Sequence, residues 1–440
     1  MKPEKAGVSM RARTEKKRSH AVEKFILRSM ATIMSRKSNG GTISPDALAI
    51  IPFSGYATNA VFHFRGRVVE KSGVVRMDHH DTFIDNAQKM WKRFFIRPGS
   101  GVTVRVRFDS MHRMVNTTTQ GFFHADLELN RPLSNSTRRP VKVEVVNPRT
   151  QPPVQAMGEV FFPPHGARIG IISDIDDTIM SAHATNPFKM ISLLMFSNAF
   201  TRQPFPGVRP FYRALHGGLT GCERNPFFYI SSSSWQMYDI LQDFMDIHGL
   251  PPGPIFLREL PFTGSMKDPW RHGYKLKRVH EILESYPGLP FVLLGDSGQR
   301  DVEIYSLIVR SFPGRIPVLY IRDVLPSALR RSRIAEIAVK VKDWGSELVL
   351  LNDTMAAARH AAIRGWIPVE RLSEIENDRV KMEYPERSFD AGKTPVPPAA
   401  YHEDEDTSLG LSRGKEVFMT AARRENPVPE HAAGATLSAP

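Results

Sequence analysis

The pattern of hydrophobic and polar positions changes along this 440-residue chain. Residues 50–165 contain short alternating or β-branched runs, such as VTVRVRF and VKVEVV, which Gly, Asn, Ser and Pro separate. A period of two is typical of strands that bury one face, and the separating residues favour turns. We therefore predict a small antiparallel, β-sandwich-like domain over residues 46–165.

From about Ala167 the apolar runs become continuous and alternate with stretches of helical pattern. The runs include ARIGIISD, PFFYISS and PFVLLGDS. A strand that is apolar on both faces is buried on both, which is typical of a parallel sheet covered by helices. We predict an α/β domain with a Rossmann-like parallel sheet over residues 166–375. In such sheets, ligands bind at the carboxyl ends of the strands.

The two ends of the chain have a different pattern. Residues 1–45 form a basic tail, in which apolar residues between Ser19 and Lys37 have the spacing of an amphipathic helix. Such a helix lies on a membrane surface or packs on its own protein. Residues 376–440 are poor in periodic apolar positions, and we predict a disordered tail. No window has the roughly 18 uncharged apolar residues of a spanning helix, so we expect a cytoplasmic protein, or one peripheral to a membrane.

Composition narrows the range of partners. The net charge is +13, and residues 1–40 alone hold eleven Lys or Arg and three Glu, a net charge of +8. Basic tails bind nucleic acid or anionic lipid, or stay solvated. We predict no nucleic-acid partner, because no recognition-helix, zinc or aromatic-ladder motif is present. The single cysteine, Cys222, excludes an internal disulfide. The polar run RMDHHDTF fits a solvated loop better than a metal site.

The stretch IISDIDDTIM places three carboxylates at the end of an expected buried strand. Like charges this close repel one another, and a divalent cation with its preference for oxygen ligands offsets that repulsion. In an extended segment Asp174 and Asp176 point to the same side, and Asp177 points away. One carboxylate of the pair is suited to act as a nucleophile and the other as its proton donor and acceptor.

The ends of other expected strands supply the remaining groups for attack on phosphorus. Ser231 and Ser232 follow the apolar run FFYI and offer hydroxyls to phosphate oxygens. Lys275 or Lys277, in YKLKRVHEIL, could neutralise charge in the transition state. Asp296 follows the run FVLLG and is placed to complete a metal site with Asp174.

Together these motifs resemble the haloacid dehalogenase superfamily of aspartyl-phosphate phosphatases. The matching positions are Asp174, Asp176 and Thr178 (DxDxT), Ser231, Lys275, and Asp296 with Asp301 (GDxxxxD). Over about residues 50–370, SDIDDTI, FFYISSSSWQMY and GDSGQRDVEIY resemble the actin-patch phosphatidate phosphatase family, as do IPFSGYATN and a GRV run before them. The chain departs from that family where serines replace Asn or Ala and then Pro, and where Tyr274 replaces His before the motif lysine.

The resemblance implies a role for each matched residue. Asp174 would be the nucleophile, and Asp176 would protonate the leaving group and later activate water. Ser231, Ser232 and Thr178 would bind the phosphoryl group, with Lys275 balancing its charge. Mg²⁺ would be held by Asp174, Asp296 and the backbone carbonyl of Asp176, with Asp301 supporting this metal shell.

The expected function is that of a Mg²⁺-dependent phosphatidate phosphatase, which releases diacylglycerol and phosphate. Its partners would be a phospholipid substrate and an anionic membrane surface. The apolar stretch NPFKMISLLMFSNAF, residues 186–200, would be a cap over the lipid, or a helix packed on the core. Two alternatives stay open: a phosphatase of a soluble phosphomonoester or phosphoprotein, and a non-catalytic binding module.

Overall fold

A computed structural model describes most of the chain between residues 43 and 384. The gaps in this range are residues 59, 74–88, 90–91, 93–95, 130–137, 163, 165, 181–202, 260–270 and 326. All described residues belong to one compact unit, Met1–Ser388, and the second unit, Phe389–Pro440, lies outside them. The predicted N-terminal helix, the RMDHHDTF loop and the apolar stretch 186–200 also lie outside the described residues.

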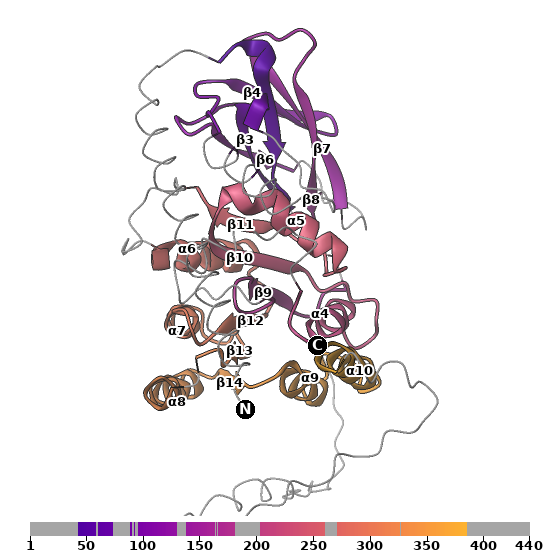
Figure 1. The fold of residues 1–440 in the computed structure, drawn as a ribbon, viewed down its shortest axis with the longest axis vertical. Coiled ribbons are helices and arrows are strands. Elements are labelled where there is room, and N and C mark those ends of the chain that lie inside the picture. The colour runs from indigo at the N-terminus through magenta and orange to yellow at the C-terminus, as the bar shows by residue number, and fades with distance from the viewer. Residues whose placement is uncertain are drawn as a thin grey trace, which may run out of the picture. The chain divides into compact units, whose positions relative to one another are not determined.

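The first part of the described chain is β-rich, as predicted (Figure 1). The sheet has the strand order β1-β3-β2-β8-β7-β4-β5, and β6 pairs with β3. Its neighbouring strands are antiparallel except for the short pairing of β2 with β8. The strands are β1 (Leu48–Pro52), β2 (Gly55–Ala57), β3 (Val61–Glu70), β4 (Thr103–Phe108), β5 (Met111–Asn116), β6 (Phe122–Glu128), β7 (Arg138–Asn147) and β8 (Gln155–Phe161).

Alternating apolar residues of these strands form the core of the β-rich part. Phe62 and Phe64 on β3 pack with Val104 on β4 and Phe123 on β6, and all four are buried. Gly66 on β3 is required by this packing, since a Cβ atom there would lie 2.4 Å from the Phe123 ring. The period of two in the sequence therefore reflects one buried face per strand.

The second part is a six-stranded sheet in which every neighbouring pair of strands is parallel. The strand order is β11-β10-β9-β12-β13-β14, so β9 lies near the middle. The strands are β9 (Gly170–Asp174), β10 (Phe227–Ser234), β11 (Ile255–Arg258), β12 (Phe291–Asp296), β13 (Val318–Arg322) and β14 (Glu347–Leu351). All residues of β9 and β12 are buried, which explains their continuous apolar sequence.

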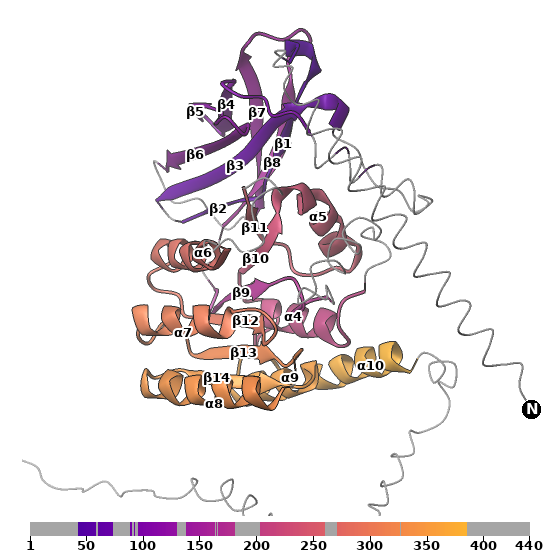
Figure 2. The same ribbon diagram turned by 60° about the vertical axis from the view of Figure 1, so that its left-hand side comes forward.

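Helices cover both faces of the parallel sheet, which confirms the predicted α/β arrangement (Figure 2). One face packs against α4 (Val208–Gly217), α5 (Tyr238–Ile247) and α9 (Thr354–Ile363), and α10 (Arg371–Glu383) packs on α4 and α9. The other face packs against α6 (Arg271–Ser285), α7 (Asp301–Ser311) and α8 (Ala328–Asp343). Ser327 and Asp353 begin two of these helices, because their side-chain oxygens accept backbone N–H groups at the starts of α8 and α9.

Helix α10 passes the boundary at residue 375 that the sequence pattern suggested. It ends at Glu383, and Ile375 within it is fully buried. Beyond Ile375 the helix is polar, and Arg379 pairs with Glu376 and Glu383 at helical spacing. These pairs carry no hydrophobic periodicity, so the apolar pattern could not reveal them. Within the described ranges, no helix has the length and apolar character needed to cross a membrane.

The β-rich part contacts the segment that follows β10. That segment is a short 3-10 helix, η3 (Trp235–Met237), which leads into α5. The Arg67 guanidinium carbon lies 3.5 Å from the centre of the Trp235 ring. The Tyr238 hydroxyl accepts the Ser54 backbone N–H at 2.6 Å. The β-rich part therefore packs against the residues that directly follow the serine-rich end of β10.

Candidate active site

The carboxyl ends of three neighbouring strands meet at one edge of the parallel sheet. β9 ends at Asp174, β12 ends at Asp296, and β10 finishes with the run Ser231–Ser234. The register pairs Ile230 of β10 with Asp174 of β9, so the serines follow at the level of the loop after β9. This is the edge at which ligands bind in open α/β sheets.

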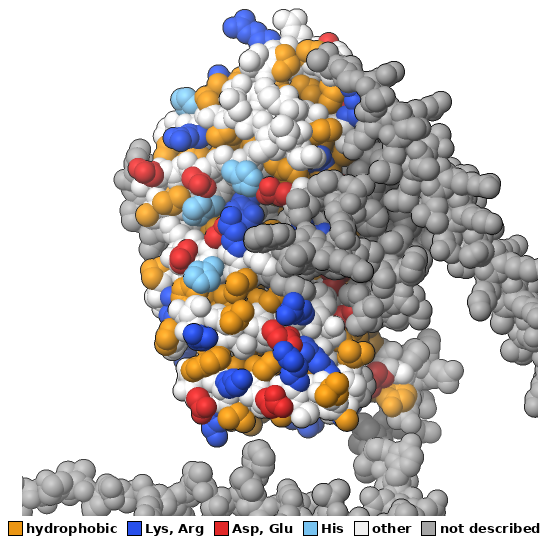
Figure 3. Space-filling view, turned by 90° about the vertical axis from the view of Figure 1, so that its left-hand side faces the viewer, with side chains coloured by type: hydrophobic (Ala, Val, Ile, Leu, Met, Phe, Trp, Pro, Cys, Tyr) orange, Lys and Arg blue, Asp and Glu red, His pale blue; other side chains and the backbone are white. Residues whose placement is uncertain are grey.

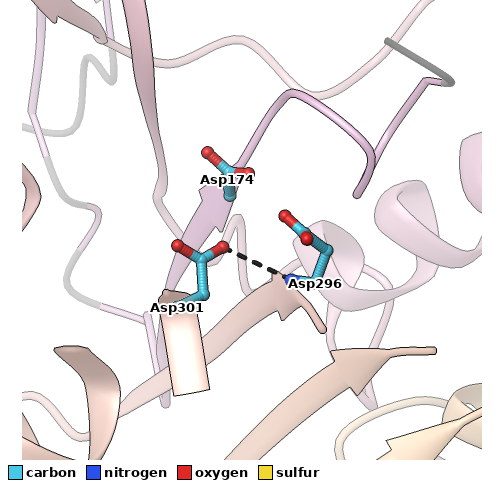
Figure 4. Close-up of side chains that lie close together, drawn as sticks. All are labelled: Asp174, Asp296 and Asp301. Carbon is cyan, nitrogen blue, oxygen red and sulfur yellow. Dashed lines mark hydrogen bonds between the residues drawn. The ribbon is translucent and has the colours of Figure 1, made fainter. Parts of the chain in front are cut away.

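Three buried carboxylates converge at this edge (Figure 4). Asp174, Asp296 and Asp301 each offer an oxygen, and these atoms lie within 4.8 Å of one another. All three side chains are fully buried. Asp301 begins α7, and its Oδ2 accepts the backbone N–H of Asp296 at 3.3 Å. A hard divalent cation is the ligand that this set of oxygens fits.

Lys275 of α6 is the positive charge within this cluster. Its Nζ lies 2.8 Å from Asp174 Oδ1 and 2.6 Å from Asp301 Oδ1. Burial alone would lower the pKa of Lys275, but Asp174 and Asp301 raise that pKa above its ordinary value, so the ammonium stays charged. Lys277, the other candidate, is 71% exposed and lies 3.9 Å from Glu281. The structure therefore brings Lys275 into the cluster and leaves Lys277 on the surface.

Two carboxylate oxygens of this cluster lack a hydrogen-bond partner among the described residues. Asp174 Oδ2 and Asp296 Oδ2 are buried and have no hydrogen-bond partner within the described part of the chain. Burial raises the pKa of Asp174 well above its ordinary range, and burial together with Asp301 raises the pKa of Asp296 to about 7. Three carboxylates share one ammonium, so a bound cation would relieve both the desolvation and the repulsion.

The carboxylate of Asp176 lies outside the three-carboxylate cluster and is held by serines. Ser231 Oγ donates to Asp176 Oδ2 at 2.6 Å, and Ser233 Oγ donates to the same oxygen at 2.9 Å. The backbone carbonyl of Asp176 accepts the Gln299 side-chain amide at 3.4 Å, from the loop after β12. Two hydroxyls thus fix the orientation of the Asp176 carboxylate, which suits a group that transfers protons.

The loop after β9 has a tight backbone. Asp177 has φ +59°, in the left-handed region, and is buried. Thr178 is buried as well, and its hydroxyl oxygen has no hydrogen-bond partner among the described residues. The Thr178 carbonyl accepts Nε of Arg322, at 3.3 Å.

Sequence reasoning missed Ser233 and Gln299. Ser231 and Ser233 are two positions apart and reach the same Asp176 oxygen, as same-face residues of a strand do. Ser232, which we predicted to bind phosphate, lies between them, and its role stays a prediction. The alternation rule applied to the serine run was the available signal for Ser233. No sequence signal indicates Gln299, because its contact with the Asp176 carbonyl depends on how the loop after β12 folds.

Comparison with known proteins places the catalytic edge inside a recognised segment. Residues 169–323 match the family model described as phosphatidate phosphatase APP1, catalytic domain. Over 165 residues the chain is 33% identical to phosphatidate phosphatase APP1 of Saccharomyces cerevisiae, a match that covers 37% of this chain and 27% of the yeast protein. An uncharacterized protein of Schizosaccharomyces pombe is 29% identical over 160 residues, covering 36% and 25%. These matches support the phosphatidate phosphatase family for this segment.

The match spans only about a quarter of the length of these curated relatives. Solved structures show remote likenesses. A carbohydrate acetylesterase from Xanthomonas citri has a TM-score of 0.27 at 9% identity, with 68% of this chain and 66% of that one covered. A β-glucuronidase from Parabacteroides merdae has a TM-score of 0.24 at 7% identity, with 69% and 40% covered. Likenesses this weak support no inference about fold or function.

Proposed function

We propose that this protein is a Mg²⁺-dependent phosphatidate phosphatase of the haloacid dehalogenase type, working through an aspartyl-phosphate. The sequence matches support a phosphoric monoester hydrolase of the phosphatidate phosphatase family. The observation that carries the chemistry is the buried cluster of Asp174, Asp296 and Asp301 around Lys275. We include in the proposal a cytoplasmic location with peripheral contact to membranes.

The residues present fit a magnesium ion. Asp174 and Asp296 each keep one buried carboxylate oxygen that has no hydrogen-bond partner among the described residues. The resemblance adds the backbone carbonyl of Asp176 as a third ligand. Asp301 would support these ligands without binding the ion directly, since its carboxylate already pairs with Lys275 and accepts the Asp296 backbone N–H. When bound, the ion would screen the phosphate charge from the attacking carboxylate.

In the first half of the proposed reaction, one carboxylate oxygen of Asp174 attacks phosphorus in line with the ester oxygen. The bond from phosphorus to that oxygen breaks, and Asp176 gives its proton to the departing diacylglycerol. Lys275 and the Thr178 hydroxyl, which bonds no described residue, hold the phosphoryl oxygens, so the charge that develops on them meets an ammonium and a hydroxyl. The product is an acyl phosphate on Asp174.

In the second half, Asp176 takes a proton from water, and that water attacks the acyl phosphate. Inorganic phosphate leaves, and Asp174 is again a carboxylate. The proton that Asp176 takes from water replaces the one that left with diacylglycerol, so the cycle closes. The hydrogen bonds from Ser231 and Ser233 orient Asp176 for both proton transfers.

The test is release of phosphate from phosphatidate in mixed micelles, with Mg²⁺ and with a chelator. We expect the unmodified protein to release phosphate only with Mg²⁺, and Asp174→Asn to release none. Equal rates for the two proteins would overturn the mechanism. Release from soluble phosphomonoesters alone would remove the lipid substrate and leave the soluble-substrate alternative.

A further inference from the structure

The segment that joins β13 to α8 exposes leucines beside arginines. We call this segment, together with the first residues of α8, the rim segment and define it as residues 323–333 apart from 326. Leu329 is 85% exposed and Leu325 is 42% exposed. The side chains of Arg331 and Arg333 are 51% and 64% exposed. A single exposed leucine needs no explanation, but two apolar side chains among basic ones on one short segment form an amphipathic surface.

Hydrogen bonds tie the rim segment to the catalytic edge. Ser297, the residue after Asp296, accepts the backbone N–H groups of Val324 and Leu325 on its Oγ, at 3.0 and 3.1 Å. Nε of Arg330 donates to the Ser297 carbonyl at 2.8 Å. The exposed leucines therefore lie on a segment that packs against the loop after β12, at the edge of the sheet where the strands have their carboxyl ends.

The rim segment is held firmly in this position. Arg330 is part-buried, and it bonds Glu303 of α7 at 2.6 Å and the Gln299 carbonyl at 3.0 Å. Ile334 is buried in the core under α8. Because these anchors fix one side of the segment, Leu329 is presented outward by a rigid helix start.

The charge of the rim segment favours an anionic partner. Three arginines of the segment pair with two acidic residues, Asp323 and Glu303. These arginines are Arg330, Arg331 and Arg333. Arg331 and Arg333 remain more than half exposed despite these pairs, so their charges face solvent. Hydrophobic, basic and acidic side chains are intermixed on the face of the molecule over α7 and α8 (Figure 3), so the excess of basic charge is local to the rim segment.

We propose that the rim segment docks the protein on an anionic lipid surface. Leu325 and Leu329 would enter the boundary between headgroups and acyl chains, and Arg331 and Arg333 would lie among the headgroup phosphates. This would bring the carboxylate cluster to the plane in which phosphatidate presents its phosphate, and it rests on the proposed lipid substrate. A second copy of the chain is a poorer occupant, since a stable interface buries about 800 Å² per partner and the segment is short.

A fluorescent probe at position 329 tests docking directly. Cys222 is the only cysteine and is exposed, so Cys222→Ser gives a background for single-site labelling. Leu329→Cys would carry an environment-sensitive dye, and Ile363→Cys is the matched control. Ile363 is 84% exposed and ends α9 at the opposite edge of the sheet, where Arg364 donates to the Pro317 carbonyl.

The full chain would be mixed with vesicles of phosphatidylcholine and phosphatidylserine, which contain no substrate. We expect a blue shift of the dye at 329 and none at 363. No shift at 329, or equal shifts at both positions, would overturn the proposal. So would a blue shift at 329 that appears without vesicles as protein concentration rises, because a second copy would then be the occupant.

Paired substitutions test the leucines and the arginines separately. The double change Leu325→Ser and Leu329→Ser should lower the ratio of activity on vesicle phosphatidate to activity on a soluble aryl phosphate by about tenfold. Ile363→Ser should leave that ratio unchanged. Arg333→Gln should weaken vesicle binding, and Arg364→Gln, which likewise loses a pairing with one glutamate, should not.

The proposal would be contradicted if the leucine double variant and Ile363→Ser had equal effects, or if Arg333→Gln and Arg364→Gln did. The failure of the proposed function is a separate result. A wild-type protein with no activity on any phosphomonoester would sink that function, while the probe at 329 would still decide docking.

Discussion

Replacement of Lys275 by methionine tests whether the carboxylate cluster depends on this single cation. Methionine keeps most of the side chain's length, so the main loss is the charge. The Nζ atom is 2.8 Å from Asp174 and 2.6 Å from Asp301, and the lysine side chain is only 2% exposed. Removing one partner of a buried ion pair costs about 3–5 kcal/mol, because the other charge stays buried and unpaired. We expect that loss in the free energy of unfolding.

The assay is urea unfolding followed by tryptophan fluorescence, with a chelator and then with Mg²⁺. The deficit should shrink with Mg²⁺, because a cation bound to the folded state replaces part of the missing charge. Lys277→Met is the control: its side chain is 71% exposed and 3.9 Å from Glu281, so the change should be within about 0.5 kcal/mol.

Activity gives a second measure of the same substitution. Lys275→Met should lower kcat by about 10²–10³-fold, the range seen when one preorganised transition-state donor is removed. The reasoning would be refuted by a Lys275→Met protein as stable and active as the unmodified one. It would also fail if Lys277→Met were the more damaging change.

Three further predictions concern the proposed metal site, Ser231, and the packing of the β-rich part against the segment after β10. Asp296→Asn should raise the Mg²⁺ concentration needed for half-maximal activity by at least about tenfold, measured in a magnesium titration and checked by calorimetry of Mg²⁺ binding. Ser231→Ala, which removes the 2.6 Å hydrogen bond to Asp176, should lower kcat by about 10–100-fold with little change in KM, and an unchanged kcat would contradict this. A double-mutant cycle of Arg67→Met and Trp235→Leu should give a coupling energy of about 1 kcal/mol in unfolding experiments, and a value near zero would argue against the stacking.

The architecture could be predicted where burial leaves a clear pattern. The run that became β9 is apolar because helices cover both faces of the sheet, and the alternation in β4 reflects its single buried face. The polar end of α10 could not be predicted, because ion pairs such as Arg379 with Glu383 stabilise it without apolar periodicity. The packing of Arg67 on Trp235 was also hidden, since it joins residues far apart in the chain.

The site could be predicted as far as strand geometry determines it. Asp174 and Asp296 end neighbouring parallel strands, and such ends meet at one edge. The choice between Lys275 and Lys277 depends on the rotation of α6 about its axis, which its packing against the sheet determines. Two lysines two positions apart face different sides of a helix, so tertiary structure was needed to decide between them.

The most direct measurement is the site of covalent phosphorylation during turnover. In the proposed mechanism Asp176 activates water, and an aryl phosphate needs no acid to release its leaving group, so an intermediate should accumulate in Asp176→Asn. After Mg²⁺, substrate and an acid quench, peptide mass spectrometry should find one phosphoryl group on Asp174. The double variant Asp174→Asn, Asp176→Asn should show none. An unmodified Asp174 in the Asp176→Asn protein, or full turnover by Asp174→Asn, would contradict the account.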